Sequence, residues 1–268
     1  MLEHSFLSIR TLRKYLGKIQ KSNFQEHMRI TSIDIETTGI KSETSQVLQI
    51  GAVVFETTSE TFTPLGTYNK VIFHKEIHGN PFAIQMNAEI IKKIALIGES
   101  YYDNVKKYYD LIASVGKPEY DKNLATRLHN DIKEKETIGM PPEMIAEDFY
   151  QFLITHEAYY IDETSQKRHF NVTGKNFWGF DNNFLVKLPN WKLFFHRRSF
   201  DPVNLYYNPN DIVLPSLTEC KKRCIEMLHN EESEELRNIF TSSEVTHDAL
   251  DDAMDVAKLV WYKVRPRS

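Results

Sequence analysis

The sequence predicts an α/β fold in which a mixed β-sheet is flanked by α-helices. Three closely spaced segments rich in β-branched and apolar residues are typical of an antiparallel meander of strands, and they span 30–36, 47–56 and 68–74. Further along the chain, helical periodicity alternates with two more apolar segments, 170–173 and 193–200. Strands followed by alternating helices and strands favour this class over an all-α or all-β domain.

Five segments carry apolar residues at helical spacing, and each has a recognisable start. Asn87 is a candidate N-cap for the first, and two prolines precede the second. The expected helices are 87–97, 143–156, 177–187, 215–228 and 246–264.

Composition excludes several classes of protein. With 41% hydrophobic residues in 268, the chain can bury a core, which excludes a disordered protein. No apolar run approaches the roughly 20 residues that cross a bilayer, so we expect no membrane association and a cytoplasmic location. The two cysteines, Cys220 and Cys224, allow no disulfide framework, and they read best as one buried helix face. A net charge of −4 disfavours a protein that coats long duplex.

The chain divides into a short basic appendage, residues 1–28, and a working domain, residues 29–268. An accessory helix, a flexible arm and an organelle transit peptide all fit the basic, amphipathic start, and Met28 is an alternative first residue. Within the domain, about 100–140 begins with four tyrosines on an expected helix and continues as a charged stretch. We interpret it as an insertion packed on the edge of the core.

The first candidate chemical feature is the D-x-E pair on the first strand. Residues two apart in a strand point to the same face, so Asp34 and Glu36 aim two carboxylates together, with Ile33 and Ile35 opposite. Two adjacent carboxylates repel each other, and a divalent cation between them relieves that repulsion. A solvent-facing edge strand is the alternative.

The second feature is a glycine-bearing turn after a strand, 174–181, which ends in Asp181. The turn brings this acid close to the C-terminal end of the preceding strand, where α/β proteins often place their sites. A helix cap is the alternative role for the carboxylate.

The third feature is a crowd of acids at the start of the last helix, preceded by His247. Asp248, Asp252 and Asp255 fall at i, i+4 and i+7, so they share a face and are expected to repel one another without a cation. A histidine beside such carboxylates can accept a proton near neutral pH. Spacing alone does not select among the acids.

Taken together and in this order, the three motifs resemble those of the DEDDh 3′–5′ exonucleases of the ribonuclease H-like superfamily. That group includes polymerase proofreading subunits, RNase T and oligoribonuclease, and the similarity spans about 30–258. The resemblance implies a ribonuclease H-like sheet and selects Asp252 among the clustered acids. It implies that Asp34, Glu36, Asp181 and Asp252 bind metal and that His247 is the general base.

The resemblance also implies a mechanism and partners. Two Mg²⁺ or Mn²⁺ ions, roughly 4 Å apart in such sites, clamp the scissile phosphate of a single-stranded DNA or RNA 3′ end. Hydrolysis releases nucleoside 5′-monophosphates stepwise. Direct ligation is expected from Asp34, Glu36 and Asp252, and ligation through water from Asp181. DNA is slightly favoured over RNA, and a homodimer is left open.

Further expectations concern substrate contacts. Related enzymes hold the terminal nucleotide near a segment that matches 81–88, so Met86 and Asn87, together with Thr37, are the expected contacts. A helix cap with a core methionine is the alternative reading. The segment 195–200 offers arginines to the phosphate backbone or is an exposed basic loop. The later segments loosely resemble those of bacteriophage-encoded members.

Two other functions compete with this hypothesis. A catalytically silent ribonuclease H-like domain would bind nucleic acid or protein without cutting it, and it is expected to have lost at least one of the five residues. An internally cutting nuclease would keep them and release internal fragments.

Overall fold

The computed structural model describes residues 28–161, 167–231, 233–240 and 242–266. Apart from Met28, the expected appendage therefore lies outside the described residues. No helix within these ranges is both long and apolar enough to span a membrane.

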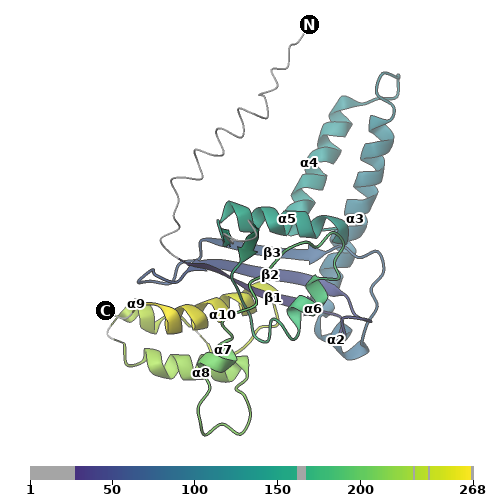
Figure 1. Cartoon of the computed structure of the whole chain (residues 1–268). Coiled ribbons are helices and arrows are strands. Elements are labelled where there is room, and N and C mark those ends of the chain that lie inside the picture. Colours follow the sequence, from purple (N-terminus) through teal and green to yellow (C-terminus); the bar gives the residue numbers. More distant parts are fainter. Residues whose placement is uncertain (1–27, 162–166, 232, 241, 267–268) are drawn as a thin grey trace, which may run out of the picture.

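A five-stranded sheet forms the centre of the domain (Figure 1). Strands β1 (Arg29–Thr37), β2 (Val47–Glu56) and β3 (Gly66–Ile72) make the expected antiparallel meander. Two short strands extend it in parallel, β7 (Val172–Thr173) beside β1 and β4 (Gly139–Met140) beside β3. The order is β4-β3-β2-β1-β7, so the predicted mixed sheet flanked by helices is confirmed.

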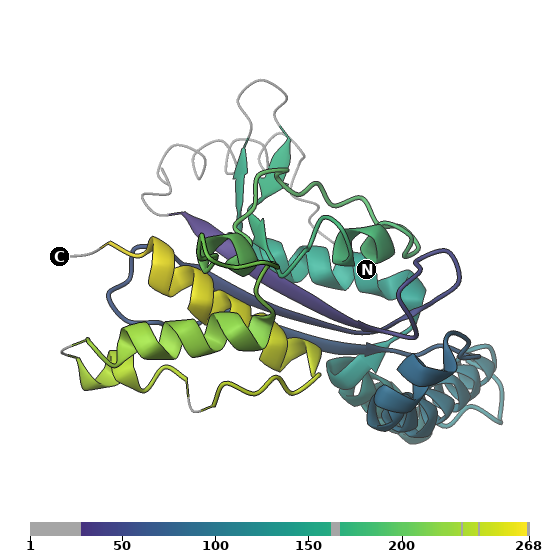
Figure 2. The ribbon, with the colours of Figure 1, turned by 90° about the horizontal axis from the view of Figure 1, so that it is seen from below.

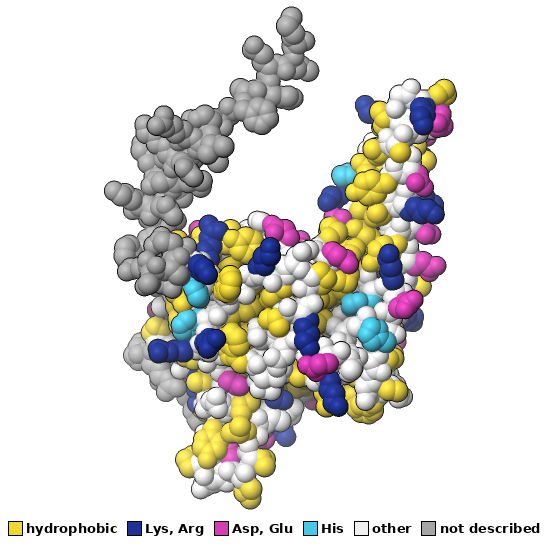
Figure 3. All heavy atoms as spheres, turned by 45° about the vertical axis from the view of Figure 1, so that its right-hand side comes forward, with side chains coloured by type: hydrophobic (Ala, Val, Ile, Leu, Met, Phe, Trp, Pro, Cys, Tyr) yellow, Lys and Arg dark blue, Asp and Glu magenta, His cyan; other side chains and the backbone are white. Residues whose placement is uncertain are grey.

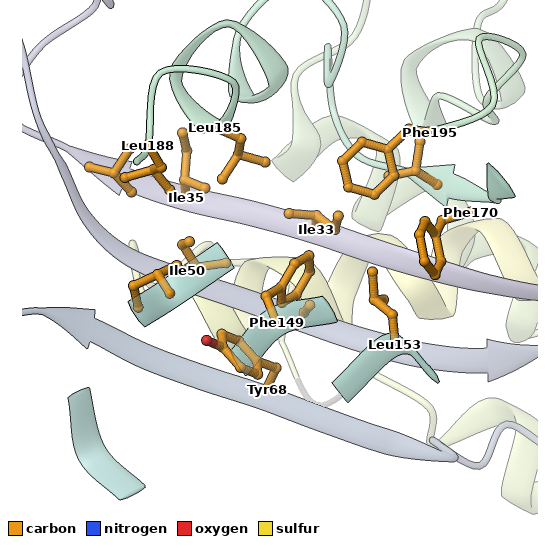
Figure 4. Packing of buried hydrophobic residues seen from close by; sticks show 14 of the residues in the cluster. Ile33, Ile35, Ile50, Tyr68, Phe149, Leu153, Phe170, Leu185, Leu188 and Phe195 are labelled. Carbon is orange, nitrogen blue, oxygen red and sulfur yellow. The ribbon is translucent and has the colours of Figure 1, made fainter. Parts of the chain in front are cut away.

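One face of the sheet is covered by α5 (Pro142–Thr155) and α6 (Asp181–Leu185). Because side chains alternate along β1, Ile33 and Ile35 both enter this layer, where they pack among aromatic residues such as Phe149 (Figure 4). A separate two-stranded sheet, β5 (Tyr159–Ile161) with β6 (Arg168–Phe170), borders it.

The other face is covered by the long helix α10 (Ala249–Val264), which contacts both β1 and β2. Helix α8 (Leu217–Leu228) lies alongside α10, with the short helices α7 (Pro202–Leu205) and α9 (Glu234–Arg237) beside it (Figure 2). Cys220 and Cys224 are buried free thiols on α8, as predicted.

The segment expected as an insertion contains much of a helical hairpin. After the short helix α2 (Pro81–Met86), α3 (Ala88–Ile112) and α4 (Lys122–Ile138) pack against each other and extend away from the sheet (Figure 1). Acidic, basic and hydrophobic side chains are interspersed over its surface (Figure 3). The expected helix 87–97 is therefore only the first part of α3.

Three expected elements need correction. The strand expected at 170–173 is divided between the end of β6 and β7, which belong to different sheets. The segment 193–200 is not a strand, and its pairing to the sheets consists of single bridges at Phe195 and Phe200. A local turn interrupts it, in which the Arg198 backbone N–H donates to Nδ1 of His196. The helix expected at 177–187 starts only at Asp181, because residues 176–180 form a turn with Asn176 at φ 55°.

Candidate active site

A cavity of about 630 Å³ opens at the end of β1, where the start of α6, the start of α8 and the start of α10 meet. Its lining combines the three sequence motifs, which lie far apart along the chain. All five residues expected to carry the chemistry line it, namely Asp34, Glu36, Asp181, His247 and Asp252.

Strand β1 presents the first two carboxylates on the face that α10 covers. Asp34 pairs in register with Gly51 of β2, and a Cβ at Gly51 would overlap the backbone carbonyl of Ala249. The missing side chain therefore lets the first turn of α10 rest directly on β2. This close approach brings Asp252, in that same turn of α10, beside the acids of β1.

The acids of α10 have different partners. Asp248 is the N-cap, and its carboxylate accepts hydrogen bonds from the Leu250 N–H at 3.0 Å and from the Gln49 side chain at 2.9 Å. Asp255 pairs with Lys221 of α8 at 2.5 Å. Lys221 is therefore a counter-cation for Asp255, one of the three acids expected to repel one another without a cation.

Asp252 differs from its neighbours because it is buried, 6% exposed, and its Oδ1 has no hydrogen-bond partner among the described residues. The adjacent Asp251 is exposed and accepts a hydrogen bond from Thr246. Leaving a carboxylate oxygen buried and unpartnered costs free energy. Among these acids, Asp252 is therefore the one with a coordination position to offer.

His247 stands immediately before the N-cap of α10 and is exposed to solvent. Its φ of 56° lies in the left-handed region, which non-glycine residues seldom occupy and which is enriched at functional sites. One ligand atom each from Glu36, His247 and Asp252 lie within 4.8 Å of one another. The turn therefore directs the imidazole toward the carboxylates.

Asp181 is buried, 3% exposed, and is the first residue of α6. Backbone N–H groups of Asp181 itself and of Ile35 hydrogen-bond to its carboxylate and lower its pKa. The bond from Ile35 joins the start of α6 to β1. The acid does not act as the N-cap of α6, which is Phe180.

Burial raises the pKa of each of the four carboxyl groups. Burial is the largest cause of the raised pKa of Asp34, and the negative charges of Asp181 and Asp252 raise this pKa further. Burial together with the charge of Asp252 raises the pKa of Glu36 to about 7, and burial raises the pKa of Asp252 to about 6. Burial raises the pKa of Asp181 to about 8 against the backbone hydrogen bonds. Such shifts mean that burial and the repulsion between neighbouring acids outweigh the positive charge near the site.

The donor set fits hard divalent cations. Oxygen ligands from carboxylates are what Mg²⁺ and Mn²⁺ prefer, and a carboxylate oxygen of Asp252 lies within 4.8 Å of the ligand atoms of Glu36 and His247. A cation there would lower every one of the raised carboxyl pKa values.

The structure adds residues to which the sequence assigned no role. Lys175, in the glycine-bearing turn, lines the cavity, and its charge lowers the pKa of Asp34. Lys221 is buried and donates to the backbone carbonyl of Glu244, which also lines the cavity. The glycine within strand β2, Gly51, was a usable signal, because glycine inside a strand often marks the close approach of another backbone.

The expected substrate contacts lie next to the cavity rather than in its lining. Asn87 is buried, and its amide donates to the backbone carbonyl of Thr37 at 3.0 Å and to the Glu36 carboxylate. The hydroxyl of Thr37 is also buried and donates to the Gly39 carbonyl at 2.8 Å. Met86 is 51% exposed. Their roles toward a substrate stay predictions.

No model of a known protein family matches the chain, and no curated protein matches it. Similar solved structures include the nuclease domain of 3′hExo, a DEDDh family member bound to rAMP, with 12% identity, a TM-score of 0.45 and coverage of 89% of this chain and 92% of that chain. Cell-death related nuclease 4 (CRN-4) aligns with 13% identity, a TM-score of 0.44 and coverage of 87% and 62%. E. coli Exonuclease I in complex with a dT13 oligonucleotide aligns with 12% identity, a TM-score of 0.42 and coverage of 88% and 40%.

This chain spans less than two-thirds of the length of the latter two structures. All three are nucleases, and the first is described as a member of the DEDDh family, the class that the sequence motifs resemble.

Proposed function

We propose that this protein is a metal-dependent 3′–5′ exonuclease of the DEDDh type, which releases nucleoside 5′-monophosphates from single-stranded 3′ ends. One observation carries the proposal: three motifs that lie 145 and 66 residues apart along the chain place four acids and a histidine in the lining of a single cavity. A silent binding domain would have no need to bury four carboxyl groups together, three of which have their pKa values raised further by others of the four.

Asp34, Glu36 and Asp252 would hold two divalent cations, with Asp181 acting through water. Bound Mg²⁺ or Mn²⁺ would supply the positive charge that orients the phosphodiester and stabilises the departing oxygen. The proposal is supported by the unpartnered Oδ1 of Asp252 and by the closeness of Glu36, His247 and Asp252.

His247 would serve as the general base. A water oxygen forms the new bond to phosphorus, its proton passes to the imidazole, and the bond from phosphorus to the 3′ oxygen of the preceding nucleotide breaks. That oxygen then takes a proton from solvent. An imidazole suits this role because it accepts and returns protons near neutral pH, and the exposure of His247 lets it pass the proton to bulk water.

The substrate would be a single-stranded end of DNA or RNA, with DNA favoured. A net charge of −4 and an acid-lined cavity disfavour extended contact with duplex, which requires many cationic contacts. Lys175 offers one cation at the cavity for a phosphate. Met86 and Asn87, together with Thr37, are the proposed neighbours of the terminal nucleotide.

The test is a time course on 5′-labelled single-stranded DNA and RNA of one sequence, with Mg²⁺, Mn²⁺ or EDTA. We expect a ladder that shortens by one nucleotide from the 3′ end, and EDTA abolishes it. Asp34→Asn and His247→Asn should each lower the rate on the order of a thousandfold. Asparagine is chosen at position 247 because it tolerates the left-handed φ better than alanine does.

The matched control is Asp251→Asn, which neutralises an exposed acid of the same helix and should leave the rate unchanged. Binding of the strands without cleavage by the wild-type protein would support the silent domain instead. Internal fragments would support an internally cutting nuclease.

A further inference from the structure

The loop between α7 and α8 exposes three consecutive large apolar residues. Ile212 is fully exposed, Val213 is 77% exposed and Leu214 is 62% exposed. In Figure 1 this loop hangs away from the body of the domain below α8. Scattered single apolar residues are normal on a surface, whereas three together at the end of a loop mark a contact site.

The base of this loop is held rigidly. The guanidinium of Arg223 donates two hydrogen bonds to the carboxylate of Asp211, at 2.6 and 2.8 Å, and one to the carbonyl of Tyr206 at 2.8 Å. The Asn208 N–H also donates to Asp211 at 2.9 Å. The apolar tip is therefore fixed in position before any partner arrives, and a preorganised group binds at a lower entropic cost.

The same loop continues directly into the wall of the candidate active site. Ser216, Leu217 and Thr218 line the cavity, and Ser216 also caps α8 by accepting from the Glu219 N–H. Ile212 is four residues before Ser216, so an extended chain places it at most about 14 Å away. Any strand that enters the cavity by this side passes the loop.

We propose that residues 212–214, the apolar tip, contact the bases of the nucleic-acid strand outside the cavity. This inference rests on the proposed function. Isoleucine and leucine side chains serve elsewhere as wedges between bases, and contact with base faces tolerates any sequence. The acid of this loop, Asp211, is paired with Arg223, which also pairs with Glu219 of α8, and the tip itself carries no charged residue. The apolar tip thus contacts the nucleotides on the 5′ side of the terminal one.

Substrate length tests this inference. A dinucleotide fills only the cavity, whereas a dodecanucleotide also reaches the tip, because about 14 Å corresponds to about four stacked nucleotides. We compare the triple variant Ile212→Ser/Val213→Ser/Leu214→Ser with the wild-type protein on both substrates in Mn²⁺. The matched control is Leu96→Ser/Val115→Ser/Leu124→Ser, which changes three exposed apolar residues of the α3–α4 hairpin.

We expect kcat/KM of the triple variant to fall about tenfold on the dodecanucleotide and to stay unchanged on the dinucleotide. The hairpin control should match the wild-type protein on both. An equal loss on the two lengths, or no loss on either, overturns the inference and assigns the tip a structural role or a protein partner.

Binding separates this inference from the proposed function. Fluorescence anisotropy of the labelled dodecanucleotide in EDTA gives a Kd that does not depend on cleavage. If the wild-type protein cuts neither substrate, the proposed function fails, and the tip is then judged by binding alone. A Kd that rises about tenfold in the triple variant supports the contact, and an unchanged Kd overturns it.

Discussion

The two faces of the central sheet are built from the same strands but have opposite chemistry. On the α5–α6 face, Ile33 and Ile35 of β1 meet a continuous apolar layer. On the α10 face, β1 is apolar only at its start, where Ile30 packs in the same cluster as Trp261. Its later residues on that face, Asp34 and Glu36, are acids. Alternation along one strand therefore makes a core on one side and a site on the other.

The two faces contribute differently to the stability of the domain, because one buries apolar side chains and the other buries carboxyl groups. The apolar face contributes mainly the burial of hydrophobic side chains. The α10 face holds Asp34, Glu36 and Asp252, and Asp181 at the start of α6 lies beside them at the end of β1. All four carboxyl groups have raised pKa values, and ionising them in the folded protein costs free energy. Experiments on the α10 face can distinguish an acid that already forms an ion pair with a side chain from acids that would bind a metal cation.

The largest effect is expected at Lys221, the cation that already pairs with an acid of α10. Its ammonium is buried between Asp255 and the carbonyl of Glu244. Lys221→Met leaves the largely buried Asp255 carboxylate without its hydrogen-bonded cation, so the free energy of unfolding should fall by about 3 kcal/mol. Urea unfolding in EDTA measures this change.

The double variant Lys221→Met/Asp255→Leu is the control, since it removes both charges. Its stability should return close to that of the wild-type protein, because paired buried charges contribute little net stability. If the double variant is as unstable as Lys221→Met, the loss comes from packing at α8 rather than from the unpaired acid.

The next effect is expected at Gly51, where β2 touches the first turn of α10. Gly51→Ala puts a methyl group into the backbone of Ala249, so the turn must move away from β1. A displacement of about 1 Å in a catalytic group can cost a hundredfold, and we expect the exonuclease rate to fall about 10- to 100-fold. The rate on a single-stranded oligonucleotide in Mn²⁺ measures it.

Gly98→Ala is the matched control. Gly98 lies in helix α3, and a Cβ there would be 3.4 Å from Phe73, which is an ordinary van der Waals distance. It should leave the rate unchanged. A Gly51→Ala protein with the full rate would mean that the close approach of α10 to β2 does not set the geometry of the site.

Much of this architecture could be predicted from the sequence, because the patterns that carried it are local. Strand β2 spans 47–56, as periodicity predicts, and the D-x-E spacing places two acids on one face of β1. The choice of Asp252 needed the resemblance to a family, since spacing alone treats the acids of α10 alike. Their difference lies in partners from elsewhere in the chain, Gln49 and Lys221, which no local pattern reveals.

Other features depend on tertiary contacts and escaped prediction for that reason. Residues 193–200 have the composition of a strand, but apolar packing of Phe195 and a local turn at His196 take the place of a ladder. The second helix of the hairpin, α4, has a low apolar content and is held mainly by contact with α3. The local sequence of α4 therefore does not predict this helix, because its stability depends on packing against α3.

The smallest effect concerns the pH dependence of stability in the absence of metal. Glu36, Asp181 and Asp252 have pKa values of about 7, 8 and 6, above those of the unfolded chain. The folded protein therefore binds more protons than the unfolded chain between about pH 4 and 8, and stability falls as pH rises through that window. Tm in EDTA should drop by about 4–8 °C per pH unit from pH 6 to 8, since the three groups together bind about 1.5 more protons in the folded protein over this range.

Mn²⁺ should oppose this drop, because a bound cation favours the ionised carboxylates, and the rise in Tm on adding it should be larger at pH 8 than at pH 6. Asp181→Asn removes the acid with the highest of the three pKa values, so its Tm should depend less on pH between 7 and 8. Asp251→Asn, on the exposed side of α10, should keep the wild-type slope. A slope that is identical in all three proteins would place its origin outside the cavity and remove the electrostatic contrast between the two faces of the sheet.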